Sequence, residues 1–330
     1  MSSEFNQRAY VSTGQLPPAD TIPALLSQVY ERYRAANDGE VSTVYPALAK
    51  ASPDVFGLAV VDVRGNCHEE GDSQASFALM SVAKPFVLAL AFQDHGIEHV
   101  IERVGIDATG LPYNSLEAIS RDPHGRTNPM VNSGAITTTS LILGDNRNER
   151  WQRIRTMLSA FAGHELHIDD EIFDSASATN HRNHELAAEV DERHGITGTA
   201  DDAVELYTRQ SCLRVSAKDL AVMGATLADG GTNPMTGVKV VDPEIARAVL
   251  VAMTVAGLYE TSGRWLMDVG LPGKSGIGGG IVTISPGKGA LGTYSAQLDP
   301  AGNSVRGVLA AGDLSRAAGL DILASTPIPT

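Results

Sequence analysis

Apolar and polar positions alternate with different spacings along the chain, and each spacing predicts an element. Within residues 19–37 the apolar positions recur at helical spacing and predict an amphipathic helix. Residues 55–63 form a mostly apolar run typical of a buried strand, and the turn signal at residues 64–66 predicts a second strand in a hairpin. Residues 81–93 are apolar almost all round, which is typical of a helix at the centre of a domain.

The middle of the chain has the pattern of helices joined by polar loops, and its last part has the pattern of strands followed by a helix. Helices are predicted at residues 213–227 and 244–255. Two strands are predicted at residues 281–285 and 290–298, around a Pro-Gly-Lys-Gly turn, with a last helix over residues 305–319. Since strands lie towards both ends of the chain, we expect them to form one sheet in a mixed α/β fold of the α+β type.

The same pattern predicts the domain organisation. Residues 1–18 are expected to be a flexible N-terminal arm, and residues 19–330 to form a single domain. The sheet part is expected at about residues 50–80 and 270–330, with a helical part inserted at about residues 81–265. A site would then lie where the two parts meet.

Composition narrows the class of protein. The chain has 330 residues, of which 43% are hydrophobic and 19% charged, as expected of a soluble globular protein. A formal net charge of −14 argues against binding to nucleic acid or to an anionic membrane surface. Cys67 and Cys212 are too few for a disulfide framework, so we expect reduced thiols in a cytoplasmic protein. No signal peptide and no membrane-spanning run is evident.

The strongest chemical signal is a serine followed by a lysine at the start of the most apolar predicted helix. Ser81 is a poor nucleophile unless a base removes its proton. Lys84 lies one turn further on, and a buried lysine can lose its proton near neutral pH and act as that base. Roughly one Ser-x-x-Lys is expected by chance in a chain of this length. A lysine in so apolar a helix nevertheless indicates a function.

A second signal lies far downstream, in the sequence Lys-Ser-Gly-Ile-Gly-Gly-Gly at residues 274–280. Its backbone N–H groups could stabilise a developing oxyanion, and its glycines let a substrate approach the backbone. Without Ser81 and Lys84, an ordinary glycine-rich turn before a strand would be the favoured interpretation. Together with Ser81 and Lys84 it predicts hydrolysis of an amide through a covalent serine intermediate.

Other polar residues are candidates for supporting roles. Asn132 near a predicted helix start could bind substrate or Ser81, or could cap the helix. Tyr207 and Tyr259 could relay a proton, although most tyrosines pack and make one hydrogen bond. The histidines show no metal-ligand spacing, and there is no phosphate loop or dinucleotide fingerprint. We therefore expect neither a metal nor an organic cofactor.

Taken in order, these motifs resemble the serine-dependent glutaminases, a family within the β-lactamase-like superfamily. The similarity runs over residues 25–323 and includes the Ser81–Lys84 pair and the segments at residues 128–136, 257–263 and 270–281. It implies a β-lactamase/transpeptidase-like fold, an antiparallel sheet flanked by helices with a helical insertion. It also implies hydrolysis of L-glutamine to L-glutamate and ammonia through an acyl-enzyme, by a homodimer or homotetramer.

The resemblance assigns a role to individual residues. Ser81 is implied to be the nucleophile and Lys84 its partner base, and the backbone N–H groups of Ser81 and Ile277 are implied to form the oxyanion hole. The side chains implied to assist proton transfer are Tyr207 and Tyr259, and those implied to bind the carboxylate end of the substrate are Asn132 and Asn183.

Three positions differ from the family pattern. Val44 stands where the family usually has tyrosine, Met80 where it has glutamine and Ala176 where it has glutamate. Those family residues contact the α-amino and α-carboxylate end of glutamine, and a buried charge that loses its partner costs about 3–5 kcal/mol. The alternative function is therefore the same chemistry on a different carboxamide that lacks the α-amino group. A second alternative is that Glu185 or Glu189 supplies the missing carboxylate.

Two other functions are weaker alternatives. The first is a catalytically idle relative that serves as a binding or scaffold protein, and the intact chemical set argues against it. The second is a penicillin-interacting hydrolase, and residues 128–135 resemble glutaminases rather than that group. The expected partner is a small-molecule amide, with no nucleic acid and no membrane.

Overall fold

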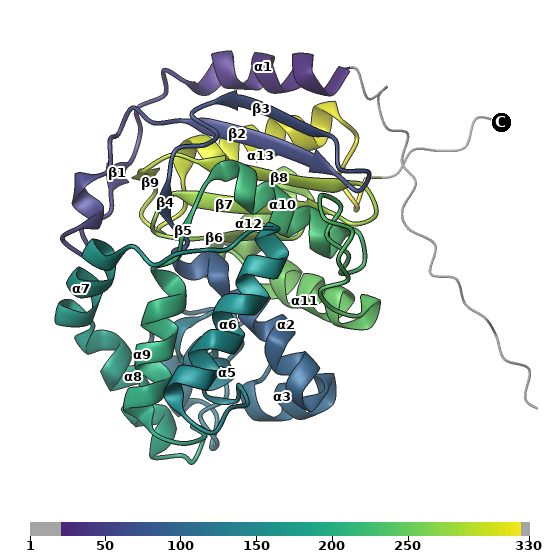
Figure 1. Ribbon diagram of the computed structural model, residues 1–330. Coiled ribbons are helices and arrows are strands. Elements are labelled where there is room, and N and C mark those ends of the chain that lie inside the picture. The colour runs from purple at the N-terminus through teal and green to yellow at the C-terminus, as the bar shows by residue number, and fades with distance from the viewer. Residues whose placement is uncertain (1–20, 325–330) are drawn as a thin grey trace, which may run out of the picture.

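The computed structural model describes residues 21–324. The arm predicted at residues 1–18 lies outside the described residues. Figure 1 shows two halves, a sheet with its covering helices above and a group of helices below. The predicted division into a sheet part and a helical part within one domain stays a prediction, and one helix of the central segment packs on the sheet instead of in the lower half.

A five-stranded antiparallel sheet is built from both ends of the chain. Its strand order is β3-β2-β8-β7-β6. Near the N-terminus β2 and β3 form the predicted hairpin, and β2 pairs on its other side with β8 from the C-terminal part. The expected antiparallel sheet built from both ends of the chain is therefore confirmed, but it does not contain every strand, since β1 with β9 and β4 with β5 form two further two-stranded sheets. The strands are β2 (Gly57–Asp62), β3 (Cys67–Gly71), β6 (Gly273–Ser275), β7 (Gly280–Ser285) and β8 (Gly289–Tyr294).

Helices cover both faces of the sheet because its strands are apolar on both sides. Leu58 and Leu291 pack towards one face, whereas their neighbours Ala59 and Ala290 pack towards the other. One face is covered by α10, and the other by α1 and α13 with α12 beside them. These helices are α1 (Thr21–Tyr33), α10 (Ala217–Ala228), α12 (Ser262–Val269) and α13 (Val305–Ala317).

The lower half is organised around α2 (Lys84–His95), whose residues from Lys84 to Phe92 are all buried. It packs against α5, α6 and α11, which confirms the prediction of an apolar helix in a central position. The other helices of this half and its borders are α3 (Ile97–Val104), α4 (Leu116–Ser120), α5 (Asn132–Ser140), α6 (Arg147–Ala162), α7 (Asp170–Thr179), α8 (His181–Asp191), α9 (Ala200–Ser211) and α11 (Pro243–Ala256).

Two predicted elements are divided in the structure. The helix predicted at residues 213–227 begins only at residue 217, because Ser216 and Asp219 form a capping box there, and β5 (Arg214–Val215) precedes it. β5 pairs with β4 (Phe77–Ala78). The strand predicted at residues 290–298 ends at residue 294, and β9 (Gln297–Leu298) leaves the sheet to pair with β1 (Glu40–Val41).

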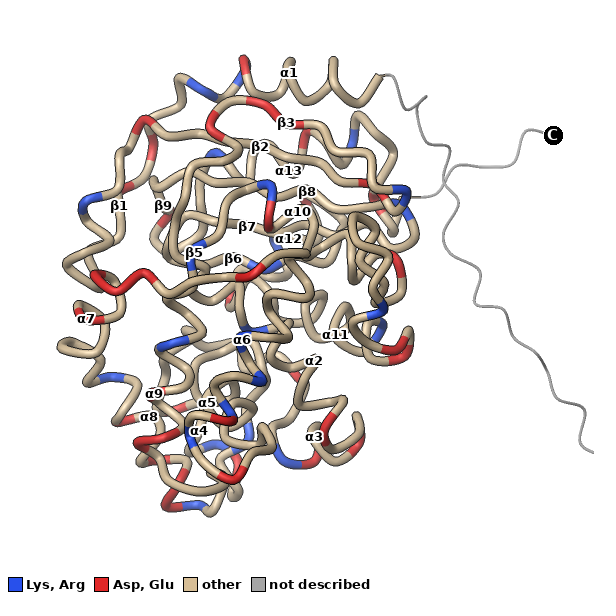
Figure 2. The backbone as a smooth tube through the Cα atoms, in the orientation of Figure 1, with Lys and Arg blue, Asp and Glu red and all other residues tan. Residues whose placement is uncertain are grey.

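Charged residues of both signs are distributed over the whole molecule. Figure 2 shows Asp and Glu interspersed with Lys and Arg in both halves, so the net charge of −14 is not gathered in one region. Among the described residues no single helix is long and apolar enough to cross a membrane. One pair of helical segments, Pro243–Ala256 and Tyr259–Val269, passes by length and composition only and is bent by 87°.

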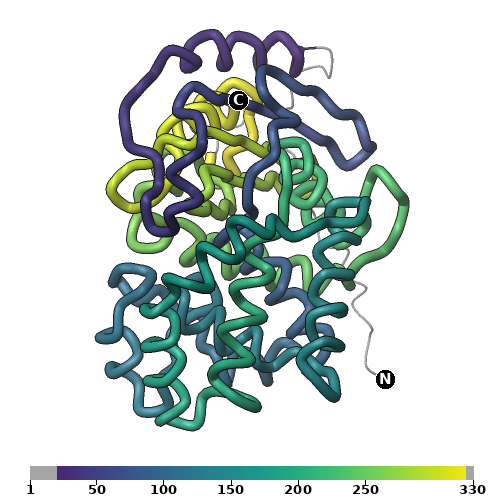
Figure 3. The backbone as a smooth tube through the Cα atoms, turned by 60° about the vertical axis from the view of Figure 1, so that its left-hand side comes forward, coloured from purple at the N-terminus to yellow at the C-terminus, as the bar shows by residue number. Residues whose placement is uncertain are grey.

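The segment after α1 links the two halves. Figure 3 shows it running from the top of the sheet half down to the helices below. The backbone N–H of Ala47 donates to Ser175 Oγ of α7 at 3.1 Å, just before the short 3₁₀ helix η1 (Leu48–Lys50). Lys50 also forms an exposed ion pair with Glu171 of α7. The residues before η1 are thereby held beside α7, where they line the candidate site.

Candidate active site

Ser81 lies in a 3₁₀ turn between the sheet and α2. The turn is η2 (Met80–Ala83), and α2 begins at Lys84, so Ser81 precedes the α-helix that was predicted to contain it. Strand β4 leads into the turn, and the backbone N–H of Leu79 donates to the carbonyl of Leu213 at 2.8 Å. The predicted pair is nevertheless formed, because Lys84 Nζ lies 2.5 Å from Ser81 Oγ.

Lys84 is a buried amine whose surroundings favour its neutral form. Only 2% of the residue is exposed, and burial lowers its pKa from 10.5 to about 7. The positive end of the α2 dipole acts in the same direction. Nζ also lies 3.1 Å from Asn132 Oδ1. At neutral pH a large share of the molecules therefore carries a lysine that can accept the proton of Ser81.

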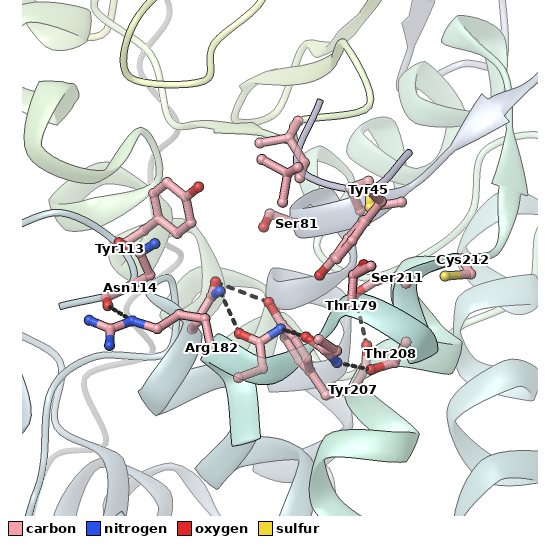
Figure 4. Close-up of a pocket in the computed structure, with 17 residues that line it drawn as sticks. Tyr45, Ser81, Tyr113, Asn114, Thr179, Arg182, Tyr207, Thr208, Ser211 and Cys212 are labelled. Carbon is pink, nitrogen blue, oxygen red and sulfur yellow. Dashed lines mark hydrogen bonds between the residues drawn. The ribbon is translucent and has the colours of Figure 1, made fainter. Parts of the chain in front are cut away.

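A series of hydrogen bonds, each side chain donating to the next, holds the side chains on the α5, α8 and α9 side of the cavity (Figure 4). Tyr207 Oη donates to Asn132 Oδ1 at 3.0 Å, and Asn132 Nδ2 donates to Asn183 Oδ1 at 2.9 Å. Asn183 Nδ2 donates to Asn180 Oδ1, and Asn180 Nδ2 donates to Thr208 Oγ1 at 2.7 Å. Each amide side chain has one orientation in this series of hydrogen bonds. The positions of the hydrogen-bond donors and acceptors on α5, α8 and α9 are therefore fixed.

Tyr259 and Lys274 pack together on the other side of Ser81. Tyr259 begins the 3₁₀ helix η3 (Tyr259–Thr261), and its hydroxyl donates to the carbonyl of Ser275 at 3.4 Å. Lys274 Nζ lies 4.0 Å from the centre of the Tyr259 ring and donates to the same carbonyl at 2.6 Å. Burial raises the pKa of Tyr259 and lowers that of Lys274 well below its usual value. The Lys-Ser-Gly motif placed Lys274 near the site, but the contact between Lys274 and Tyr259 was not predicted.

The glycine-rich loop between β6 and β7 lies directly against the Ser81 turn. A Cβ on Gly278 would lie 2.4 Å from the carbonyl oxygen of Ala78, and one on Gly276 would lie 3.1 Å from the amide nitrogen of Ser81. At Gly278 only glycine permits this approach, and at Gly276 a side chain would make an unusually tight contact. Ile277, between the two glycines, lines the cavity, and its amide nitrogen has no hydrogen-bond acceptor within the described residues. The loop can thus present a free N–H beside Ser81.

The backbone is strained on both sides of the site. Among residues 21–324 only three non-glycine residues have positive φ, and two of them are Met80 at 48° and Tyr259 at 58°. Bulky side chains rarely adopt this conformation, and such strain gathers at functional sites. Met80 directly precedes the nucleophile candidate, so the strain coincides with the point where the chain turns from β4 into α2.

The cavity at Ser81 has a volume of about 660 Å³, including its opening to solvent. Eight of the ten residues predicted for the site line it, whereas Lys84 contacts Ser81 from outside the lining and Tyr259 donates to the carbonyl of Ser275. The eight are Val44, Met80, Ser81, Asn132, Ala176, Asn183, Tyr207 and Ile277. The other lining residues are Tyr45, Tyr113, Asn114, Thr179, Asn180, Arg182, Thr208, Ser211 and Cys212.

Two tyrosines of this lining were not predicted. Tyr45 follows the substituted position Val44, so a tyrosine ring reaches the cavity from the next residue along the chain. Burial raises its pKa to about 12. Tyr113 packs its ring 4.9 Å from that of Tyr259. The Val-Tyr-Pro sequence contained the signal for Tyr45, whereas nothing in the pattern around Tyr113 pointed to the site.

Comparison with known proteins identifies relatives over almost the whole chain. A family model described as Glutaminase matches residues 39–323. Glutaminase 2 of Yersinia pestis is 52% identical over 319 residues, which cover 96% of this chain and 94% of the relative. The solved structure of a probable glutaminase, ybaS, is 37% identical with a TM-score of 0.92 and covers 94% of this chain and 100% of its own. A structure of Mglu in its glutamate form is 38% identical with a TM-score of 0.86, over 93% and 71% of the two chains.

Proposed function

Since this chain belongs to the glutaminase family and is therefore an amidohydrolase acting on an amide C–N bond, we propose that it hydrolyses a glutamine-type side-chain amide through an acyl-enzyme on Ser81. The observation that carries the proposal is the 2.5 Å contact between Ser81 Oγ and the buried amine of Lys84. A serine and a base within hydrogen-bond reach are the minimum for nucleophilic catalysis. L-Glutamine, the substrate of the family, is the first amide to test.

Acylation begins when neutral Lys84 accepts the proton of Ser81 as Oγ attacks the amide carbon. The oxygen of the tetrahedral intermediate then accepts hydrogen bonds from the backbone N–H groups of Ser81 and Ile277. As the C–N bond breaks, the proton held on Lys84 passes to the leaving nitrogen, which departs as ammonia. Tyr207 and Tyr259 assist this transfer, since both hydroxyls stay protonated and lie beside Ser81.

Deacylation repeats the same steps with water as the nucleophile. Neutral Lys84 accepts a proton from the water as its oxygen attacks the ester carbon. The Oγ–C bond then breaks, the proton returns to Ser81 and the carboxylic acid is released. Asn132 and Asn183 hold the carboxylate end of the substrate throughout. One base thus serves both halves of the reaction, and no further reactant is required.

The first prediction is that the purified protein releases ammonia and L-glutamate from L-glutamine in equal amounts. When hydroxylamine is added, it should compete with water for the acyl-enzyme and give the γ-hydroxamate of glutamate. Coupled detection of ammonia and chromatography of the products measure both. Hydrolysis that gives no hydroxamate at any hydroxylamine concentration would rule out the acyl-enzyme.

The second prediction concerns pH. Because the active form of Lys84 is the neutral one and its pKa is about 7, kcat/KM should rise about tenfold per pH unit below pH 7 and level off above it. A lysine with its ordinary pKa would instead give a rise that continues to pH 10. Steady-state rates between pH 5 and 9 distinguish the two profiles, and a profile that is flat from pH 5 would exclude Lys84 as the base.

Location and assembly complete the proposal. We infer a cytoplasmic protein, which is supported by its two free cysteines, Cys67 and Cys212. We also infer a homodimer or homotetramer, supported by the resemblance to the family alone. Sedimentation analysis of the purified protein would measure the assembly directly.

A further inference from the structure

The cavity at Ser81 contains no carboxylate. Among the described residues that line it there is neither Asp nor Glu, and Arg182 is the one side chain with a permanent charge. The rest of the lining consists of amides, hydroxyls and apolar groups. A ligand with a positive charge therefore meets no opposite charge among the residues that line this cavity.

The titratable groups of the lining are neutral as well. Burial raises the pKa of Tyr45 and of the Cys212 thiol to about 12. Burial also raises the pKa of Tyr113 and of Tyr207. All four are protonated at neutral pH, so neither a phenolate nor a thiolate can take the place of a carboxylate.

Part of the cavity wall is apolar. Ala176, Met80 and Cys212 are buried together in one apolar cluster, and Tyr45 and Ile277 pack against it. The exposed fraction of Ala176 is 1%. An ammonium group placed against this wall would lose its water without gaining a partner, which is unfavourable.

Three carboxylates near the cavity either pair with an arginine or do not line it. Glu185 accepts from Arg182 Nη1 at 2.7 Å, and Glu189 accepts from Arg193 Nη1 at 2.6 Å. Glu260 is exposed and adjoins Tyr259, but it does not line the cavity. None of the three supplies a counter-charge from its place in the structure, including the two that the sequence offered as replacements.

The cavity does offer donors to an anion. Arg182 reaches its rim, where Nε donates to the carbonyl of Asn114 at 3.0 Å and 44% of the side chain is exposed (Figure 4). Hydroxyl groups of Tyr45, Thr179 and Ser211 are also in the lining. Resting on the proposed function, we propose that the preferred substrate is a linear carboxamide with a carboxylate end and no ammonium group, such as the monoamide of a dicarboxylic acid. L-Glutamine is then turned over less efficiently.

The experiment compares L-glutamine with glutaramate, which is identical except that hydrogen replaces the α-ammonium. Ammonia release by the wild-type protein gives kcat/KM for each, with Ser81→Ala as the blank. We expect kcat/KM for glutaramate to exceed that for L-glutamine by at least about tenfold. Any smaller ratio, or a preference for L-glutamine, overturns the inference.

Variants of Ala176, in the cavity wall, separate the effect of a negative charge from the effect of side-chain volume. Ala176→Glu should shift the preference towards L-glutamine by at least about tenfold, whereas Ala176→Gln, of equal size, should not. Ala178→Glu is the matched control, because Ala178 is exposed on the same helix outside the cavity. Circular dichroism melts identify any variant that fails to fold. An equal shift in Ala176→Gln would mean that volume, and not charge, sets the preference.

Binding distinguishes this inference from the proposed function. Titration calorimetry of the wild-type protein with glutarate and with L-glutamate, the two acid products, needs no turnover. Tighter binding of glutarate supports the selectivity even if neither amide is hydrolysed, a result that would overturn the acyl-enzyme mechanism alone. Tighter binding of L-glutamate overturns the selectivity while leaving the mechanism intact.

Discussion

Replacing Ser81 with alanine is expected to lower kcat for amide hydrolysis by at least about 10⁴-fold, the scale on which serine hydrolases respond to loss of the nucleophile. The amides of the proposed oxyanion hole and the side chains proposed to bind substrate remain in the variant, but no covalent intermediate can form. Ser81 is only partly buried and its hydroxyl contacts Lys84, so the fold should be retained. Ammonia release and thermal unfolding together measure the effect.

A matched control separates loss of the nucleophile from a general serine-to-alanine effect. Ser285 lies at the end of β7 outside the Ser81 cavity, and its buried hydroxyl has no hydrogen-bond partner within the described residues. Ser285→Ala should keep wild-type kcat and should not lower the unfolding temperature. Activity of the Ser81→Ala variant within tenfold of wild type would contradict the mechanism.

Replacing Lys84 with methionine is expected to lower kcat by about 10²–10⁴-fold, which is the usual contribution of a general base. Methionine has a similar length and no charge. Because the buried amine is costly to desolvate, its removal should leave the unfolding temperature unchanged or raise it. Asn132 Oδ1 retains its hydrogen bond from Tyr207 in the variant. Loss of activity without loss of stability is the signature of a chemical role.

The residual rate of the Lys84 variant gives a second check. Its pH profile should no longer contain the limb with a pKa of about 7. Lys239→Met serves as the control, since the Lys239 side chain is 63% exposed and pairs with Asp242 on the surface. If Lys84→Met keeps the wild-type pH profile, another group must be the base.

Much of the fold was predictable because its signals are local. The apolar run at residues 55–63 and its turn gave the β2–β3 hairpin, and the all-apolar run after Ser81 gave α2. Two strands were missed because each pairs with a distant segment. Residues 297–298 continue the apolar pattern of β8, and only the presence of β1 draws them away from the sheet. β5 was hidden in the same way, because its partner is β4.

The contact between Ser81 and Lys84 and part of the cavity lining were predictable, whereas the other lining residues were not. Ser81 and Lys84 are three residues apart, so their contact could be inferred from helical spacing. Tyr45 enters the cavity because a hydrogen bond ties Ala47 to Ser175, far along the chain. The chain of amides that orients Asn132 likewise depends on α5, α8 and α9 coming together. Such contacts between distant segments cannot be predicted from the spacing of apolar residues in a single sequence.

The sheet has a consequence for how the protein is made. β2, near the start of the chain, pairs with β8, near its end, and the loop carrying Ile277 is also close to the end. During synthesis the Ser81 turn and α2 emerge long before β7 and β8, so part of their apolar surface stays uncovered until those strands leave the ribosome. The nascent chain therefore cannot complete the proposed oxyanion hole early, and we expect catalysis only after the C-terminal strands have closed the sheet.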